Sequence, residues 1–269
     1  MSSSLSDSAR EEIAEIFGRI ALVAGGVVMK VYAGAPRART KADSSPVCDA
    51  DERAEASILA ALAADLPDIP VIAEESVARG RVPECGARFI LVDPLDGTRE
   101  FLAHNGEFTV NLALIEDGAP VAGVVYAPAL EKLWLGGATA CLCAAAPGAA
   151  LPPAAARKKI AARVAPADGL VALASRSHGE AETEAFLAGL RIAERTNVGS
   201  SLKFCMIAEG AADVYPRFGP TMEWDIAAGD AILRAAGGRV LGADGAPARY
   251  GKRADHFRNG PFVAWGRAN

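Results

Sequence analysis

Apolar side chains recur at helical spacing in two long segments near the start of the chain. The first segment begins at Ser6-Asp7-Ser8, where side-chain acceptors and following acids suit a helix start, and it ends near Ala33-Gly34. The second runs from Asp49 to Ala64 and stops before Pro67. Between them, residues 37–47 are polar and rich in turn formers, so they predict a loop or an irregular hairpin. The pattern therefore predicts two amphipathic helices with an irregular connection.

Shorter apolar runs that follow predict strands. Residues 71–73 and 89–92 each end at an acid, Glu74 and Asp93 respectively, and we expect Pro94 to end the second strand. Residues 108–115 and 121–127 flank Asp117-Gly118, a strong hairpin turn, and residues 133–135 predict a further strand. An antiparallel meander is expected here, so the sheet is mixed.

Strands and helices alternate through the rest of the chain. Strands are predicted at 169–175, 192–198, 212–215, 240–241 and 262–264, and helices at 180–190, 202–210 and 222–235. Alternation of this kind indicates a layered α/β or α+β architecture. We expect one structural unit made of an N-terminal α+β half, residues 1–165, and a C-terminal α/β half, residues 166–269, with the functional site between them.

Composition narrows the class of protein. The chain has 269 residues, of which 51% are hydrophobic and 23% charged, as in an ordinary globular protein. Its net charge is -5 and it has no basic tract, which argues against a nucleic-acid polymer as partner. No uncharged apolar run reaches the roughly 18 residues of a membrane span. The five cysteines lack paired metal-ligand spacing and predict reduced thiols in a cytoplasmic protein.

The stretch 91–98 (LVDPLDGT) has the strongest chemical signal. A strand end aims Asp93 at a fixed place, Asp96 follows three residues later, and Gly97-Thr98 open a short helix at 99–103. Two carboxylates beside free backbone N–H groups suit Mg²⁺ bridging a phosphate. Asp-Pro and Asp-Gly are also common turn formers, so this string alone is equally typical of a turn.

Three further acids stand at the ends of predicted elements: Asp51, Glu74 and Asp225. Five carboxylates brought together would repel one another strongly, so their convergence would imply divalent cations. Taken singly, Glu74 could be a surface acid and Asp225 a helix cap.

Three ordered motifs resemble the inositol monophosphatase superfamily of Mg²⁺-dependent phosphatases. They are residues 72–76 (IAEES), 93–98 (DPLDGT) and 224–229 (WDIAAG). Within that superfamily, five other segments look like the 3′(2′),5′-bisphosphate nucleotidase branch: 97–101, 105–111, 175–178, 199–205 and 215–221. The resemblance covers nearly the whole chain and is weakest at 138–168. It implies a layered αβαβα sandwich of the sugar phosphatase fold.

The resemblance also implies the metal site and the catalytic groups. Glu74, Asp93 and the backbone carbonyl of Leu95 would hold one Mg²⁺, and Asp93, Asp96 and Asp225 would hold a second. Glu74 would also help to place a third, weakly held ion. Asp51, paired with the Thr98 hydroxyl, would orient and deprotonate the attacking water.

Substrate contacts follow from the same resemblance. The phosphate would lie near Glu74, Asp96 and Asp225 and over the N–H groups of Gly97 and Thr98. The adenosine and its second phosphate would be contacted by His178, Ser200, Lys203 and Arg217. Other interpretations remain for three of these: His178 as an exposed residue, Lys203 as a solvated helix residue and Arg217 as an ion-pair partner of a loop acid.

The implied activity is removal of the 3′-phosphate of adenosine 3′,5′-bisphosphate, with its 5′-phosphosulfate relative as a further substrate, in sulfate assimilation. Two alternatives stay open: inositol monophosphatase or fructose bisphosphatase activity, and an inactive metal or nucleotide sensor. The expected partner is a small molecule. A homodimer and a peripheral location at the inner membrane are also left open.

Overall fold

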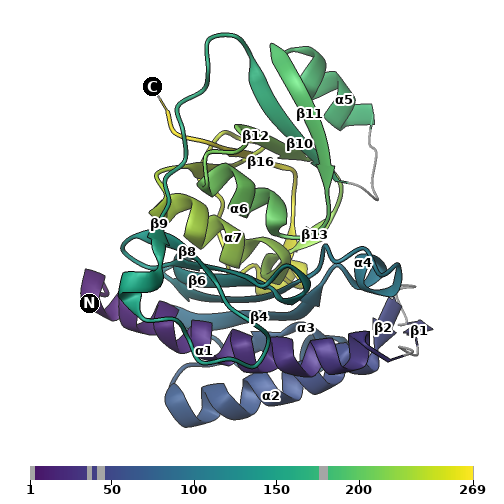
Figure 1. Ribbon diagram of the computed structural model, residues 1–269, viewed down its shortest axis with the longest axis vertical. Coiled ribbons are helices and arrows are strands. Elements are labelled where there is room, and N and C mark those ends of the chain that lie inside the picture. The colour runs from purple at the N-terminus through teal and green to yellow at the C-terminus, as the bar shows by residue number, and fades with distance from the viewer. Residues whose placement is uncertain (1–3, 35–37, 41–45, 176–180, 269) are drawn as a thin grey trace.

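The protein is described from a computed structural model, in which residues 4–34, 38–40, 46–175 and 181–268 are placed (Figure 1). The helices are α1 (Asp7–Tyr32), α2 (Asp49–Asp65), α3 (Glu74–Ala78), α4 (Thr98–Leu102), α5 (Ala181–Ala188), α6 (Leu202–Ala208) and α7 (Glu223–Ala235). Ser6 caps α1 by accepting a hydrogen bond from the Ala9 amide, as its position predicted. In these ranges no helix is both long and apolar enough to cross a membrane.

Seven strands form the larger sheet in the order β3-β4-β5-β6-β7-β8-β9. They are β3 (Val71–Ala73), β4 (Arg88–Asp96), β5 (Thr109–Glu116), β6 (Ala119–Ala127), β7 (Lys132–Gly136), β8 (Ala140–Ala144) and β9 (Lys158–Lys159). Strand β3 is parallel to β4, and every later neighbour is antiparallel, so the predicted meander is confirmed. Asp117 and Gly118 both have positive φ, as a tight hairpin turn requires.

The expectation that Pro94 ends its strand is wrong. Strand β4 pairs Asp93 with Asn111, skips register, and pairs again at Asp96 with Thr109. A proline cannot donate to the ladder, but an irregularity at that point lets pairing resume beyond it. Both aspartates therefore belong to one strand that is held by β5.

A second sheet of five strands has the order β11-β10-β12-β16-β14. Its strands are β10 (Leu170–Ser175), β11 (Ile192–Val198), β12 (Val214–Arg217), β14 (Arg239–Gly242) and β16 (Phe262–Trp265). Two short antiparallel pairs complete the fold. One joins β1 (Ala38–Thr40) to β2 (Pro46–Cys48), where the loop or hairpin was expected, and the other joins β13 (Thr221–Met222) to β15 (Arg258–Asn259).

The elements stack in five layers (Figure 1). Helices α1 and α2 cover one face of the seven-stranded sheet, α6 and α7 lie between the two sheets, and α5 covers the far face of the smaller sheet. The αβαβα sandwich expected from the resemblance is therefore confirmed. Cores on both sides of the large sheet fix where its strand ends point.

Two sheet glycines let α7 approach closely. Gly123 and Gly136 face each other on β6 and β7, and a Cβ at Gly136 would lie 2.6 Å from the Ile232 Cα. That contact is with backbone, which cannot swing aside. The depth at which α7 sits against the sheet is therefore set by these glycines.

We expect Gly136→Ala to lower the free energy of unfolding by about 1–3 kcal/mol, because the added methyl group overpacks the layer between sheet and helix. Urea denaturation of the purified protein measures this. Gly86→Ala is the control, since no atom lies within 4 Å of a Cβ there. Equal stability of the two variants would contradict the account of α7 packing.

Candidate active site

A cavity of about 280 Å³ opens where the two halves of the chain meet. Its walls come from α3, the ends of β4 and β10, the start of α4, residues 199–200, α6, β12, residues 220–221 and the start of α7. Eight residues expected at the site line it: Glu74, Asp96, Gly97, Thr98, Ser200, Lys203, Arg217 and Asp225. The structure thus brings together groups that lie up to 151 positions apart in the sequence.

Three other expected residues lie beneath the cavity wall. Asp51, Asp93 and Leu95 are almost fully buried, with exposed fractions of 1%, 2% and 1%. The Thr98 hydroxyl is 3.3 Å from Asp51 Oδ1 and 3.4 Å from the Leu95 carbonyl oxygen, so the expected contact between Thr98 and Asp51 is present. His178 lies outside the described residues.

The carboxylates of the site repel one another in a buried setting. Burial, and then repulsion by Glu74, Asp96 and Asp225, raise the pKa of Asp93 well above its usual range. Burial raises the pKa of Asp225 in the same way, with Asp96 and Glu74 adding to the effect. These four acids repel one another when ionised, so a bound positive charge would stabilise their ionised forms.

The chemistry of this donor set fits Mg²⁺, which prefers oxygen ligands. Among the described residues, however, no three His, Cys, Asp or Glu side chains lie close enough together to form a ready-made metal centre. The residues that would hold such ions are Glu74, Asp93, Asp96 and Asp225, with the Leu95 carbonyl.

Asp225 combines two roles that sequence reasoning treated as alternatives. It is the third residue of α7, and its Oδ2 accepts a hydrogen bond of 2.8 Å from the Met222 amide, as a helix cap does. Its carboxylate also lines the cavity. The cap therefore fixes the orientation of a group that faces the site.

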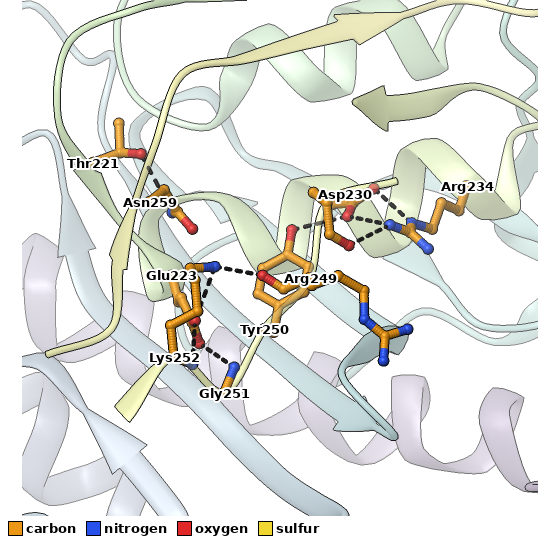
Figure 2. Close-up of polar contacts among 10 residues, drawn as sticks. Thr221, Glu223, Asp230, Arg234, Arg249, Tyr250, Gly251, Lys252 and Asn259 are labelled. Carbon is orange, nitrogen blue, oxygen red and sulfur yellow. Dashed lines mark hydrogen bonds and ion pairs between the residues drawn. The ribbon is translucent and has the colours of Figure 1, made fainter. Parts of the chain in front are cut away.

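The start of α7 is held in place by hydrogen bonds from residues 251–252, which follow the helix in the sequence (Figure 2). Glu223, which is fully buried, accepts hydrogen bonds from the amides of Gly251 and Lys252 at 2.7 and 2.8 Å, and the Lys252 ammonium lies 3.0 Å from it. Two helical turns further on, buried Asp230 accepts from Arg234 and from the Tyr250 hydroxyl. These contacts hold the helix end that carries Asp225.

Lys203 is buried rather than solvated. Its side chain is 4% exposed, and its ammonium donates to the Val198 and Ser200 carbonyls at 3.0 and 2.6 Å. Desolvation lowers the pKa of Lys203 to about 8, and the nearby Asp96 opposes this shift. The interpretation as a solvated helix residue is wrong. The ammonium also lies 5.0 Å from the centre of the Tyr215 ring, and Lys203 lines the cavity.

Arg217 is 7% exposed and donates to the Pro220 carbonyl at 3.3 Å. Arg217 and Lys203 line the same cavity as Glu74, Asp96 and Asp225. The cavity therefore offers carboxylates suited to cations and basic groups suited to an anionic part of a ligand.

Sequence reasoning missed Ser201 and Asn111 as parts of the site. Ser201 donates to Asp96 through both its amide and its hydroxyl, and Asn111 donates to Ser201. One signal could have pointed to Asn111: it is a polar residue in a strand, β5, whose residues are all buried. A buried polar side chain needs a hydrogen-bond partner. It also missed Arg99, an exposed cation at the cavity wall.

The described cysteines are unpaired. Cys85, Cys141, Cys143 and Cys205 form no disulfide, as the odd count and spacing predicted. Burial raises the pKa of Cys205 well above its usual range, so its thiol stays protonated. Cys143 and Cys205 are buried and act as small apolar side chains in the core, whereas Cys85 and Cys141 are partly exposed.

Comparison with known proteins identifies relatives of this chain. The model of the inositol monophosphatase family matches residues 9–263. The 3′(2′),5′-bisphosphate nucleotidase CysQ of Escherichia coli O157:H7 is 44% identical over 245 residues, which cover 90% of this chain and 95% of that protein. The same-named protein of Salmonella typhimurium is also 44% identical over 245 residues, with the same coverage.

Solved structures agree on the fold. The crystal structure of CysQ from Bacteroides thetaiotaomicron, a bacterial member of the inositol monophosphatase family, superposes with a TM-score of 0.80 at 38% identity. It covers 96% of this chain and 98% of that one. An inositol monophosphatase from Anabaena has a TM-score of 0.72 at 24% identity, covering 96% of this chain and 91% of that one, which shows a shared fold only.

We expect Mg²⁺ to raise the melting temperature, and to raise it more at pH 8 than at pH 5.5. The raised pKa values of Asp93, Asp96 and Asp225 mean that these groups favour folding when protonated, and that this contribution is lost as pH rises through their folded-state pKa. Above that pH a bound cation relieves the repulsion. At a Mg²⁺ concentration 100 times its dissociation constant, the gain is about 2.7 kcal/mol.

Differential scanning fluorimetry at both pH values measures the effect, with Asp225→Asn as comparison. That variant should melt higher than the wild type without Mg²⁺ at pH 8 and gain less when Mg²⁺ is added. The same gain at both pH values would argue against a carboxylate-bound cation.

Proposed function

Because the chain belongs to the inositol monophosphatase family, we propose that it is a Mg²⁺-dependent phosphomonoesterase that acts on adenosine 3′,5′-bisphosphate. It removes the 3′-phosphate and releases AMP and inorganic phosphate. The observation that carries this proposal is a single cavity lined both by the acids Glu74, Asp96 and Asp225 and by the cations Lys203 and Arg217. The names of relatives 44% identical over 90% of the chain support the choice of substrate.

The acidic and the basic residues of the cavity are proposed to bind different parts of the substrate. Glu74, Asp96 and Asp225 would hold the Mg²⁺ that neutralises charge on the phosphate to be hydrolysed. The second phosphate is proposed to be bound by Arg217, whose planar guanidinium can bind it bidentately, and by Lys203, which supplies a point charge. Ser200 and His178 are proposed to contact the adenosine. A 5′-phosphosulfate fits the same arrangement, which connects the enzyme to sulfate assimilation.

In this proposal the N–H groups of Gly97 and Thr98 hold oxygens of the scissile phosphate. Gly97 has a φ of +91°, a conformation that side chains disfavour, and a Cβ there would lie 3.1 Å from the Glu107 carbonyl oxygen. Glycine therefore lets the backbone turn toward the ligand. The hydrogen bond from the Phe101 amide to the Gly97 carbonyl closes the turn at 2.9 Å.

Asp51 and Thr98 act on the attacking water. The Thr98 hydroxyl, within reach of Asp51 Oδ1, orients the water for in-line attack on phosphorus, and Asp51 accepts its proton. Two or three Mg²⁺ ions bound to Glu74, Asp93, the Leu95 carbonyl, Asp96 and Asp225 would lower the pKa of that water and neutralise charge on the leaving oxygen. We also propose a cytoplasmic location, which the free cysteines among the described residues support.

Steady-state kinetics of the purified protein with Mg²⁺ test the substrate. We expect kcat/KM for adenosine 3′,5′-bisphosphate to exceed that for inositol 1-phosphate and for fructose 1,6-bisphosphate by at least about tenfold, because only the nucleotide has both phosphates and an adenosine to fill the cavity. A preference for inositol 1-phosphate would replace the proposal with inositol monophosphatase activity. Absence of phosphate release from all three would favour a sensor.

Asp51→Asn tests the base. We expect kcat to fall by about 10²- to 10⁴-fold with little change in KM, because the amide cannot accept the proton but keeps the contact with Thr98. Stopped assays of phosphate release measure both constants. Arg79→Gln, which removes an exposed ion pair with Glu52 outside the cavity, is the control and should keep wild-type kinetics.

A further inference from the structure

Ser201 lies at a junction of four hydrogen-bonding contacts. Its amide and its Oγ are each 2.7 Å from Asp96 Oδ2, its Oγ is 2.8 Å from the Asp225 carbonyl oxygen, and Asn111 Nδ2 is 2.8 Å from the same Oγ. The residue is 1% exposed. A buried hydroxyl with this many partners is held in one place.

The partners of Ser201 come from separate parts of the fold. Asp96 ends β4, Asn111 lies in β5, and Asp225 belongs to the first turn of α7. Ser201 itself directly precedes α6 in the other half of the chain. One side chain therefore connects the large sheet to both helices of the middle layer, at the point where the cavity opens.

The contacts also orient the Asp96 carboxylate. Within the described parts of the chain, the hydrogen-bond donors that reach Asp96 come from Ser201 and Asn111, and all of them act on Oδ2. Two of them are 2.7 Å long. A carboxylate held at one oxygen cannot rotate freely, so its Oδ1 is fixed as the oxygen available to a cation.

The turn that carries Ser201 is itself fixed on both sides. The Gly199 amide donates to Glu107 Oε2 at 2.7 Å, and a Cβ at Gly199 would lie 2.8 Å from the Glu107 carbonyl oxygen. Ser200 has a φ of +45°, a strained value for a non-glycine residue, and its carbonyl accepts from buried Lys203. Ser201 is therefore delivered to Asp96 by a backbone that cannot shift easily.

We infer that Ser201 is a positioning residue that orients the Asp96 carboxylate and sets its distance from the backbone of Asp225, the other residue whose carboxylate is expected to bind the same cation. The hydroxyl has one proton for two acceptors, Asp96 Oδ2 and the Asp225 carbonyl, and it accepts from Asn111 in either case. It therefore keeps both acceptors within 2.8 Å of a single atom. This inference rests on the metal site of the proposed function, but not on the identity of the substrate.

Isothermal titration calorimetry of Mg²⁺ into the substrate-free, full-length protein tests the inference. We expect Ser201→Ala to weaken Mg²⁺ binding about tenfold or more, since outer partners of ligands typically matter at that level. Ser201→Thr keeps the hydroxyl and should stay within about threefold of wild type. Ser6→Ala, which removes a hydroxyl that caps α1 far from the cavity, lowers the melting temperature without changing Mg²⁺ affinity.

A folded Ser201→Ala protein with wild-type Mg²⁺ affinity overturns the inference, as does a wild type that binds no Mg²⁺. If Ser201→Ala does not fold, Ser201→Cys replaces it, because a thiol is of similar size but a much weaker donor. Wild-type Mg²⁺ affinity in that variant likewise overturns the inference. Phosphate release measured in parallel separates the two proposals: preference for another substrate rejects the nucleotidase function and leaves the Mg²⁺ result standing.

Discussion

Repulsion among buried carboxylates is the constraint around which this protein is arranged. Burial raises the pKa of Asp93, Asp96 and Asp225, and Glu74 adds to the repulsion felt by Asp93 and Asp225. A fold can keep such a cluster only if strong packing elsewhere holds its members in place. Here that packing is a five-layer sandwich whose large sheet is covered by helices on both faces.

The helices of the middle layer, and α7 above all, position the residues of the site. Helix α7 must approach the sheet closely enough for Asp225 to face Asp93 and Asp96, and the sheet glycines opposite it make that approach possible. Its fully buried acids, Glu223 and Asp230, are satisfied by the segment around Tyr250 and Lys252 (Figure 2). Buried charge that is fully hydrogen-bonded in this way fixes a unique helix position, since breaking any one contact leaves an unpaired group.

The same arrangement explains how acidic and basic residues from different elements come to line one cavity. Acids come from strand and helix ends of the N-terminal half and from α7, whereas Lys203 and Arg217 come from α6 and β12 beside the smaller sheet. The two halves meet at the turn 199–201, where Gly199 and Ser201 bond to Glu107 and Asp96. Both halves therefore contribute acidic and basic residues to one cavity: Asp96 and Arg99 come from the N-terminal half, and Asp225 and Lys203 come from the C-terminal half.

The sequence by itself determined the elements and the identity of the acidic groups. Periodicity predicted α1, α2 and the meander to within a few residues, and the three motifs were enough to indicate the layered fold. Local pattern could do this because helix and strand periods are properties of short segments. It failed at Pro94, where pairing with β5 carries the strand past a residue that locally breaks it.

Only the tertiary structure decided which polar residues act together. Lys203 reads as a surface residue of a helix, yet α6 lies between two sheets and buries it. Ser201 looks like an ordinary residue before a helix, yet it contacts partners 90 and 105 positions away in the sequence. Burial and long-range hydrogen bonds arise when layers pack, so no short stretch of sequence contains them.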